Sequence, residues 1–200
     1  MKTKFHLALM VFSALALSIA CTSWMKGGGN RLVITYKTDK NAAPITRELL
    51  GKQSVMTTSE LTTTANGQAA RIVMYSIYVA NYDSDVKALE TQMPSSDDQI
   101  KVEIQVVAAE GSTASTPLKT ATYTASQFSD GINKFNKALD IRVKLFEKGK
   151  VLDQGISTVS PRKGFVKINS VVDDSVKGEL DMSDDFRSVK GEFNAKIVKQ

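Results

Sequence analysis

Histidine and cysteine are almost missing from this chain: each occurs once in 200 residues, as His6 and Cys21. Residues 22–200 therefore contain neither an imidazole that could accept a proton near neutral pH nor a thiol. This excludes Ser-His-Asp and Cys-His nucleophilic catalysis, disulfide bonds within the chain, and zinc or copper sites made of histidine and cysteine. Chemistry that uses paired carboxylates or a serine–lysine couple stays open.

Sequence patterns for phosphate and nucleic-acid binding are missing as well. The run Gly27-Gly28-Gly29 lacks the lysine-serine ending of a phosphate-binding loop and follows no predicted strand. Residues 1–20 hold two of the 26 basic side chains and none of the 21 acidic ones, so residues 21–200 carry a net charge of +3. Because that charge is small and dispersed, we expect no nucleic-acid partner.

The first 21 residues form a separate pattern. Residues 1–4 are basic, residues 5–17 are apolar, and Ser18-Ile19-Ala20-Cys21 closes the run with a small residue before the cysteine. The apolar run is shorter than the about 20 residues that a membrane-spanning helix needs. The pattern resembles the signal peptide and lipobox of a bacterial lipoprotein precursor.

This resemblance implies that cleavage removes residues 1–20 and leaves Cys21 as the first residue, with a thioether-linked diacylglycerol and an N-acyl chain such as palmitate. Two or three acyl chains hold a protein stably at a membrane, whereas one chain binds marginally. Thr22 stands where the inner-membrane retention signal of the family has aspartate, which favours a lipid-anchored location at the outer membrane. The alternatives are an ordinary secretory signal peptide and an uncleaved transmembrane anchor.

Residues 21–30 are predicted to be the lipidated cysteine and a flexible, glycine-containing tether, followed by one domain over residues 31–200. The dominant pattern of this domain is that of β-strands. Asn66-Gly67 predicts a two-residue hairpin turn, and residues 72–82 are apolar at successive positions, as in a strand covered on both faces. Residues 100–107 alternate, which predicts Val102, Ile104 and Val106 inside and Lys101, Glu103 and Gln105 outside.

Two short segments are predicted to be helical instead. Asp85 could cap a turn over residues 86–93, which Pro94 then ends. Apolar residues recur at helical spacing in residues 128–139, at Phe128, Ile132, Phe135 and Leu139.

A near-repeat predicts a hairpin at the end of the chain, because residues 175–180 (SVKGEL) reappear as residues 188–193 (SVKGEF). A turn at residues 183–186 would place Gly178 opposite Gly191, where the bare backbone leaves room for a bulky side chain such as Phe193. The same register predicts four cross-strand pairs: Lys177 with Glu192, Glu179 with Lys190, Val176 with Phe193, and Leu180 with Val189.

Three further groups of residues are candidates for function, each with a plainer interpretation. Aspartate pairs at residues 83/85, 97/98, 173/174 and 184/185 could supply oxygen ligands to calcium, but aspartate is also a preferred turn residue. Residues 157–163 place hydroxyls beside Lys163, although an exposed lysine would keep its proton. Tyr75, Tyr78 and Tyr82 resemble an aromatic stripe for sugars, yet Tyr75 faces away from the other two, as core tyrosines would.

These patterns predict a mainly β protein, namely a single antiparallel β-sandwich with one or two short helical turns, or alternatively a closed β-barrel. The functional hypothesis is a membrane-anchored lipoprotein of the bacterial cell envelope, a non-catalytic binding or structural module with a protein or envelope-polymer partner. The alternatives are a carboxylate-dependent glycan hydrolase and a small-ligand-binding barrel. Beyond lipidation at Cys21, no catalytic, cofactor or metal residue is predicted.

Overall fold

The computed structural model describes residues 29–65, 68–127, 130, 134–156 and 161–198, so Cys21 and most of the predicted tether lie outside the described residues. The described residues form eleven strands. They are β1 (Asn30–Tyr36), β2 (Ile45–Gly51), β3 (Gln53–Ala65), β4 (Gln68–Ala80), β5 (Ile100–Val107), β6 (Ala121–Ala125), β7 (Lys137–Glu147), β8 (Lys150–Asp153), β9 (Lys163–Val172), β10 (Ser175–Ser183) and β11 (Arg187–Ile197).

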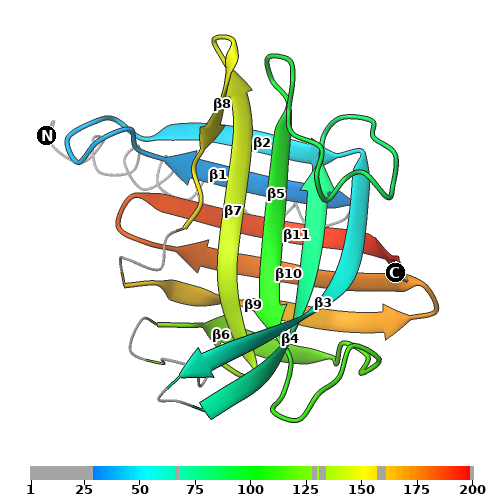
Figure 1. The fold of residues 1–200 in the computed structure, drawn as a ribbon. Helices are drawn as coiled ribbons and strands as arrows, with labels where there is room; N and C mark the ends of the chain where they lie inside the picture. The colour runs from blue at the N-terminus through cyan, green and yellow to red at the C-terminus, as the bar shows by residue number, and fades with distance from the viewer. Residues whose placement is uncertain (1–28, 66–67, 128–129, 131–133, 157–160, 199–200) are drawn as a thin grey trace, which may run out of the picture.

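The strands form two layers that cross each other in Figure 1. One layer contains β2, β1, β11, β10, β9 and β6, and the other contains β3, β4, β5, β7 and β8, with antiparallel pairing inside each layer. Two short parallel pairings, β11 with β3 and β6 with β7, join the layers into one hydrogen-bonded sheet. The predicted mainly β sandwich is therefore confirmed, with two parallel contacts that the prediction did not include.

Apolar side chains from both layers fill the space between them. One buried cluster includes Leu32 and Phe193 from the first layer and Ile77, Ile104 and Val143 from the second. Each such side chain stabilises the fold by about 1.5–3 kcal/mol through removal from water. The interior is thus a packed core, which favours the sandwich over the alternative of a barrel around a ligand cavity.

Strand β4 is covered on both faces, as its apolar sequence predicted. Tyr75, Ile77 and Val79 belong to the main core, whereas Tyr78 and Ala80 belong to a second cluster on the outer face of the layer. The predicted turn after Asp85 supplies the cover: the Ala88 amide donates to the Asp85 carbonyl, and Leu89 of the same turn is fully buried in the second cluster.

The second predicted helix is wrong where it can be compared with the structure. Phe128 and Ile132 lie outside the described residues, but residues 137–139 form the start of β7. Ala138 pairs with Val106 of β5 and with Ala125 of β6, so two neighbouring strands determine the conformation there. Such tertiary pairing overrides a helical spacing of apolar residues.

The hairpins at Asn66-Gly67 and at the end of the chain both form, but the second has a different register. Ala65 pairs with Gln68 across the first turn, whose two residues lie outside the described part of the chain. In the second hairpin, Gly178 pairs with Phe193 and Glu179 with Glu192, a shift of two residues from the prediction. The Phe193 ring lies close to Gly178, as the bare backbone allowed.

The turn explains this shift. The carboxylate of Asp184 accepts hydrogen bonds from the amides of Phe186 (2.8 Å) and Arg187 (2.7 Å), which leaves four residues between the paired Ser183 and Ser188. The predicted register left only two residues, Asp184 and Asp185, between the paired strands. Because a shift of two preserves the side-chain alternation, the inward face is unchanged while the predicted ion pairs are replaced: Lys190 pairs with Asp181, and Glu179 pairs with Lys167.

Candidate functional site

The outer face of β5 carries polar side chains that are mostly shielded from water. Lys101, Glu103 and Gln105 point outward as predicted, but Lys101 and Gln105 are only 4% exposed and the Glu103 side chain is 14% exposed. The alternation therefore predicted the direction of these side chains but not the burial of Lys101 and Gln105. Burial of such groups costs free energy unless each finds a partner, so their partners indicate what this face is for.

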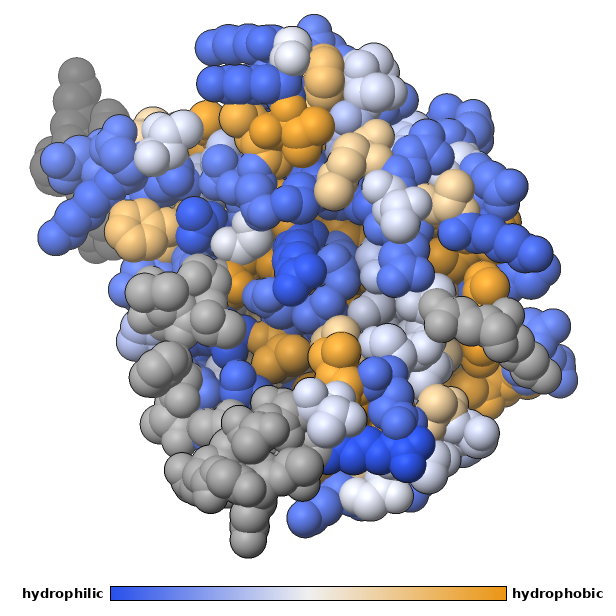
Figure 2. Space-filling model, in the orientation of Figure 1, coloured by the Kyte–Doolittle hydropathy of each residue, from blue (hydrophilic) through white to orange (hydrophobic). Residues whose placement is uncertain are grey.

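Neighbouring strands extend this polar face on both sides. Glu103 lies between Tyr78 of β4 and Arg142 of β7, and Lys101 lies beside Lys144. Figure 2 shows hydrophilic residues gathered over the middle of β5 and β7 on this side of the molecule. Strands β4, β5 and β7 thus present one continuous row of hydroxyl, carboxylate, amide and cationic groups.

The row lines a hollow of ≈ 500 Å³, which we name the polar hollow. Its floor is the outer face of β4, β5 and β7, and Glu90, Thr91 and Met93 from the segment after Asp85 stand at its rim. Volumes of this order are usual for sites that bind small molecules or short polymer segments.

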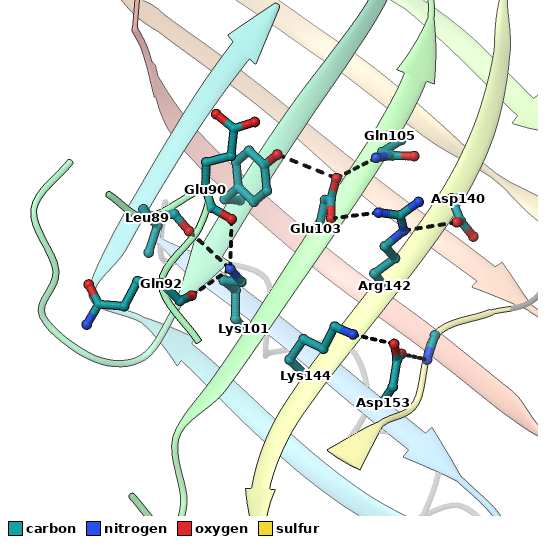
Figure 3. Close-up of polar contacts among 12 residues, drawn as sticks. Leu89, Glu90, Gln92, Lys101, Glu103, Gln105, Asp140, Arg142, Lys144 and Asp153 are labelled. Carbon is teal, nitrogen blue, oxygen red and sulfur yellow. Dashed lines mark hydrogen bonds and ion pairs between the residues drawn. The ribbon is translucent and has the colours of Figure 1, made fainter. Parts of the chain in front are cut away.

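Charges on the floor of the polar hollow balance one another (Figure 3). Glu103 is 3.7 Å from the Arg142 guanidinium and accepts a hydrogen bond from the amide of Gln105. The Arg142 guanidinium also pairs with Asp140 at 3.2 Å. The Tyr78 hydroxyl lies 3.5 Å from Glu103, and burial, helped by this carboxylate, raises the pKa of Tyr78 to about 12. The floor therefore offers fixed hydrogen-bond donors and acceptors without a large net charge.

Lys101 holds the rim in place. Its Nζ donates to the main-chain carbonyls of Leu89 (3.2 Å), Glu90 (3.1 Å) and Gln92 (2.6 Å), and lies 5.8 Å from the centre of the Tyr78 ring (Figure 3). Burial lowers the pKa of Lys101. Lysines often bind the last carbonyls of a helical turn in this way. Lys101 is thus a structural residue of the polar hollow.

The carboxylate of Glu103 is arranged as an ion-pair partner and hydrogen-bond acceptor. A glycan hydrolase needs two carboxyl groups about 5–10 Å apart, one of them kept protonated by its surroundings. Glu103 instead lies 3.7 Å from the Arg142 guanidinium, with which it forms an ion pair. Its neighbours Gln105 and Tyr78 orient it as a hydrogen-bond acceptor.

Two of the acidic turns use an aspartate carboxylate to hold the backbone. Asp85 accepts a hydrogen bond from the amide of Lys87, and Asp184 closes the last hairpin turn. Within the described ranges, no three histidine, cysteine, aspartate or glutamate side chains gather into a group that could hold a metal ion. The turn interpretation of these two aspartates is therefore confirmed.

The remaining sequence candidates separate clearly. Of the hydroxyl and lysine stretch, residues 157–160 lie outside the described residues, and Lys163 is exposed at the start of β9. Tyr75 lies in the main core and donates to the Thr116 carbonyl at 2.7 Å, while Tyr78 and Tyr82 lie in the outer cluster. All three are core tyrosines, as their opposite faces predicted.

Sequence reasoning did not identify the polar hollow. Alternation along β5 showed which side chains point outward, but it contained no sign that the segment after Asp85 covers them. The one available signal was the set of apolar residues in that segment, which needed a surface to pack on. Leu89 is the residue of that segment that packs on the outer face of the sheet.

Comparisons of the chain with protein-family models, curated proteins and solved structures find no match. In the described part of the chain, no helical segment has the length and hydropathy of a membrane span.

Proposed function

We propose that this protein is a lipid-anchored lipoprotein of the bacterial cell envelope that binds a polar envelope polymer, without catalysis, in the polar hollow. The observation that carries the binding proposal is the row Tyr78, Glu103 and Arg142, whose polar atoms hold one another in place on the outer face of β4, β5 and β7. Lipidation at Cys21 rests on the lipobox pattern.

A glycan is the polymer that this floor fits best. Sugar hydroxyls donate and accept hydrogen bonds, and the floor offers both kinds of partner: carboxylate and amide oxygens, guanidinium and amide N–H groups, and a phenol hydroxyl. Because Arg142 is already paired with Glu103 and Asp140, the ligand needs no large net charge of its own.

The anchor would keep the domain close to such a polymer. Residues 22–30 span at most about 30 Å when fully extended. A tethered domain meets targets within that reach at a high effective concentration, so even weak hydrogen bonding to a repeating polymer gives useful occupancy. Sorting to the outer membrane, which Thr22 favours, would place the domain beside the envelope glycans.

Membrane attachment is tested by the substitution Cys21→Ser. We expect the parent to fractionate with membranes and its intact mass to show a chain that begins at Cys21 and carries acyl groups. Cys21→Ser should shift to the soluble or uncleaved fraction, whereas Ser23→Ala, two positions away, should behave like the parent. A mature chain that begins elsewhere and has no acyl mass would contradict the proposal.

Glycan binding is tested with the full-length protein in non-ionic detergent and immobilised peptidoglycan. Arg142→Gln should weaken retention several-fold because it removes a donor from the floor and leaves Glu103 without its cation. Lys167→Gln, an exposed change on β9, is the matched control and should bind like the parent. Equal retention of all three proteins would reject the polar hollow as the site, and glycan cleavage that stops in Glu103→Gln would favour the hydrolase instead.

A further inference from the structure

A second hollow lies where strands of both layers end, and it shares no residue with the polar hollow. We name it the end hollow; its volume is ≈ 430 Å³. Tyr36 at the end of β1, Ile100 at the start of β5, and Leu145 and Phe146 near the end of β7 form its apolar wall.

Tyr36 gives the first indication of a ligand here. Its side chain is 1% exposed, and its hydroxyl has no hydrogen-bond partner among the described residues. The other four tyrosine hydroxyls all have a described partner: the carbonyls of Thr116, Gln92 and Lys119 for Tyr75, Tyr82 and Tyr123, and the Glu103 carboxylate for Tyr78. A buried hydroxyl without a partner is unfavourable, and Tyr36 lines the end hollow, so a polar atom of a ligand there is a candidate partner.

The charges around the end hollow give an independent indication. Of its four carboxylates, Glu147 pairs with Arg47 at 3.4 Å, and Glu48 pairs with Arg31. Asp97 and Asp98 are exposed, and no side-chain hydrogen bond or ion pair of either is found among the described residues. Besides Arg47, Lys148 is the only basic side chain among the described residues that line the end hollow. The four carboxylates therefore outnumber the basic side chains of the lining, and the rim has a surplus of negative charge.

The backbone beneath this rim is fixed rather than loose. The Asn81 side chain donates to the Asp98 carbonyl at 2.8 Å and accepts from the Ile100 amide at 2.8 Å. Asn81 thereby ties the aspartate turn to the start of β5, beside the apolar wall. This end of the sandwich therefore combines a carboxylate rim, an apolar wall and one hydroxyl without a described partner.

We propose that the end hollow binds a small organic amine with an apolar body and a polar group. The protonated amine would be balanced by Asp97 and Asp98, the apolar body would lie against Phe146 and Leu145, and the polar group would pair with the Tyr36 hydroxyl. This inference is independent of the proposed glycan binding and of lipidation, because it uses different residues.

Three probes of nearly equal size test the proposal with the full-length chain in non-ionic detergent. Tyramine carries an amine and a hydroxyl, phenethylamine carries only the amine, and 4-hydroxyphenylpropionate carries a hydroxyl with a negative charge. Calorimetric or NMR titration at pH 7 should give the tightest binding for tyramine, several-fold weaker binding for phenethylamine, and the weakest for the anion.

Two variants assign the contacts. Tyr36→Phe removes only the hydroxyl and should weaken the affinity for tyramine about 2- to 12-fold, which corresponds to the loss of one hydrogen bond. The affinity for phenethylamine should stay the same. Asp97→Asn combined with Asp98→Asn should weaken both amines and reduce their preference over the anion. Asp173→Asn combined with Asp174→Asn, in an exposed turn outside the end hollow, is the charge-matched control and should change nothing.

The melting temperature of each variant separates misfolding from lost binding. Because the Tyr36 hydroxyl has no described partner, Tyr36→Phe should melt at or above the temperature of the parent. The proposal would be overturned by equal affinity for the amines and the anion, or by an equal loss of affinity for both amines in Tyr36→Phe. It would also be overturned if tyramine at about 10 mM gave no binding signal.

Discussion

Replacement of Lys101 by methionine tests how the segment after Asp85 is held against the sheet. Methionine keeps much of the side-chain length but removes the ammonium, and with it the donors to the carbonyls of Leu89, Glu90 and Gln92. The Gln92 carbonyl keeps a second partner, the Tyr82 hydroxyl at 3.3 Å, so two carbonyls lose their described side-chain donor.

The magnitude follows from these two carbonyls. A buried acceptor without a partner costs about 1–3 kcal/mol, and removal of a buried ammonium returns part of that loss. We therefore expect Lys101→Met to lower the free energy of unfolding by about 2–4 kcal/mol. For a chain of this size, that corresponds to a decrease in melting temperature of about 4–16 °C.

Urea unfolding followed by circular dichroism measures this loss, and Lys144→Met on the same face is the control. Lys144 pairs with Asp153, whose side chain is 58% exposed, and such partly exposed pairs contribute about 0–1 kcal/mol. Hydrogen exchange should also speed up at the Gln92 amide, which donates to the Ala88 carbonyl, in Lys101→Met alone. If both variants unfold at the parental urea concentration, Lys101 does not hold this segment.

Two other predictions concern stability. Gly178→Val should destabilise the fold by about 1–3 kcal/mol because its added carbons would overlap the ring that lies against this glycine. Gly191→Val should cost at least as much, because φ is +142° there and a Cβ would also meet a β1 carbonyl. If either variant melts at the temperature of the parent, these placements are wrong. At alkaline pH, burial raises the pKa of three tyrosines to about 12, from about 10 in the unfolded chain: Tyr75, Tyr78 and Tyr82. Their contribution is fully present below pH 10 and should fall by about 4 kcal/mol per pH unit between pH 10 and 12. Phenolate absorbance and urea midpoints check this, and full titration of the folded protein near pH 10 would refute it.

The sequence was most informative where the conformation depends on neighbouring residues. Alternation assigned the inward face of β5 and the opposite faces of Tyr75 and Tyr78, and Asn66-Gly67 located a hairpin between two strands of the sheet. These features follow from side-chain alternation and turn chemistry, which a single sequence contains.

The features that were missed depend on distant residues or on side-chain hydrogen bonds within a turn. Lys101 was placed on the correct face, but its burial depends on a segment that folds back over it. The predicted register of the β10–β11 hairpin was wrong by two residues because the hydrogen bonds of Asp184 stabilise a longer turn. Only the arrangement of both layers shows that Tyr36 lines a hollow and that its buried hydroxyl has no described partner.

The position of β11 has a consequence for the order of folding. This last strand pairs with β1, the first strand, with β10, and at its end with β3. Until residues 187–197 are available, the hairpin of β1 and β2 has no described strand partner in its layer. Such pairings between distant parts of a chain form slowly, because the entropy of closing a long loop must be lost first. We therefore expect folding on a millisecond-to-second scale that follows, rather than accompanies, emergence of the chain.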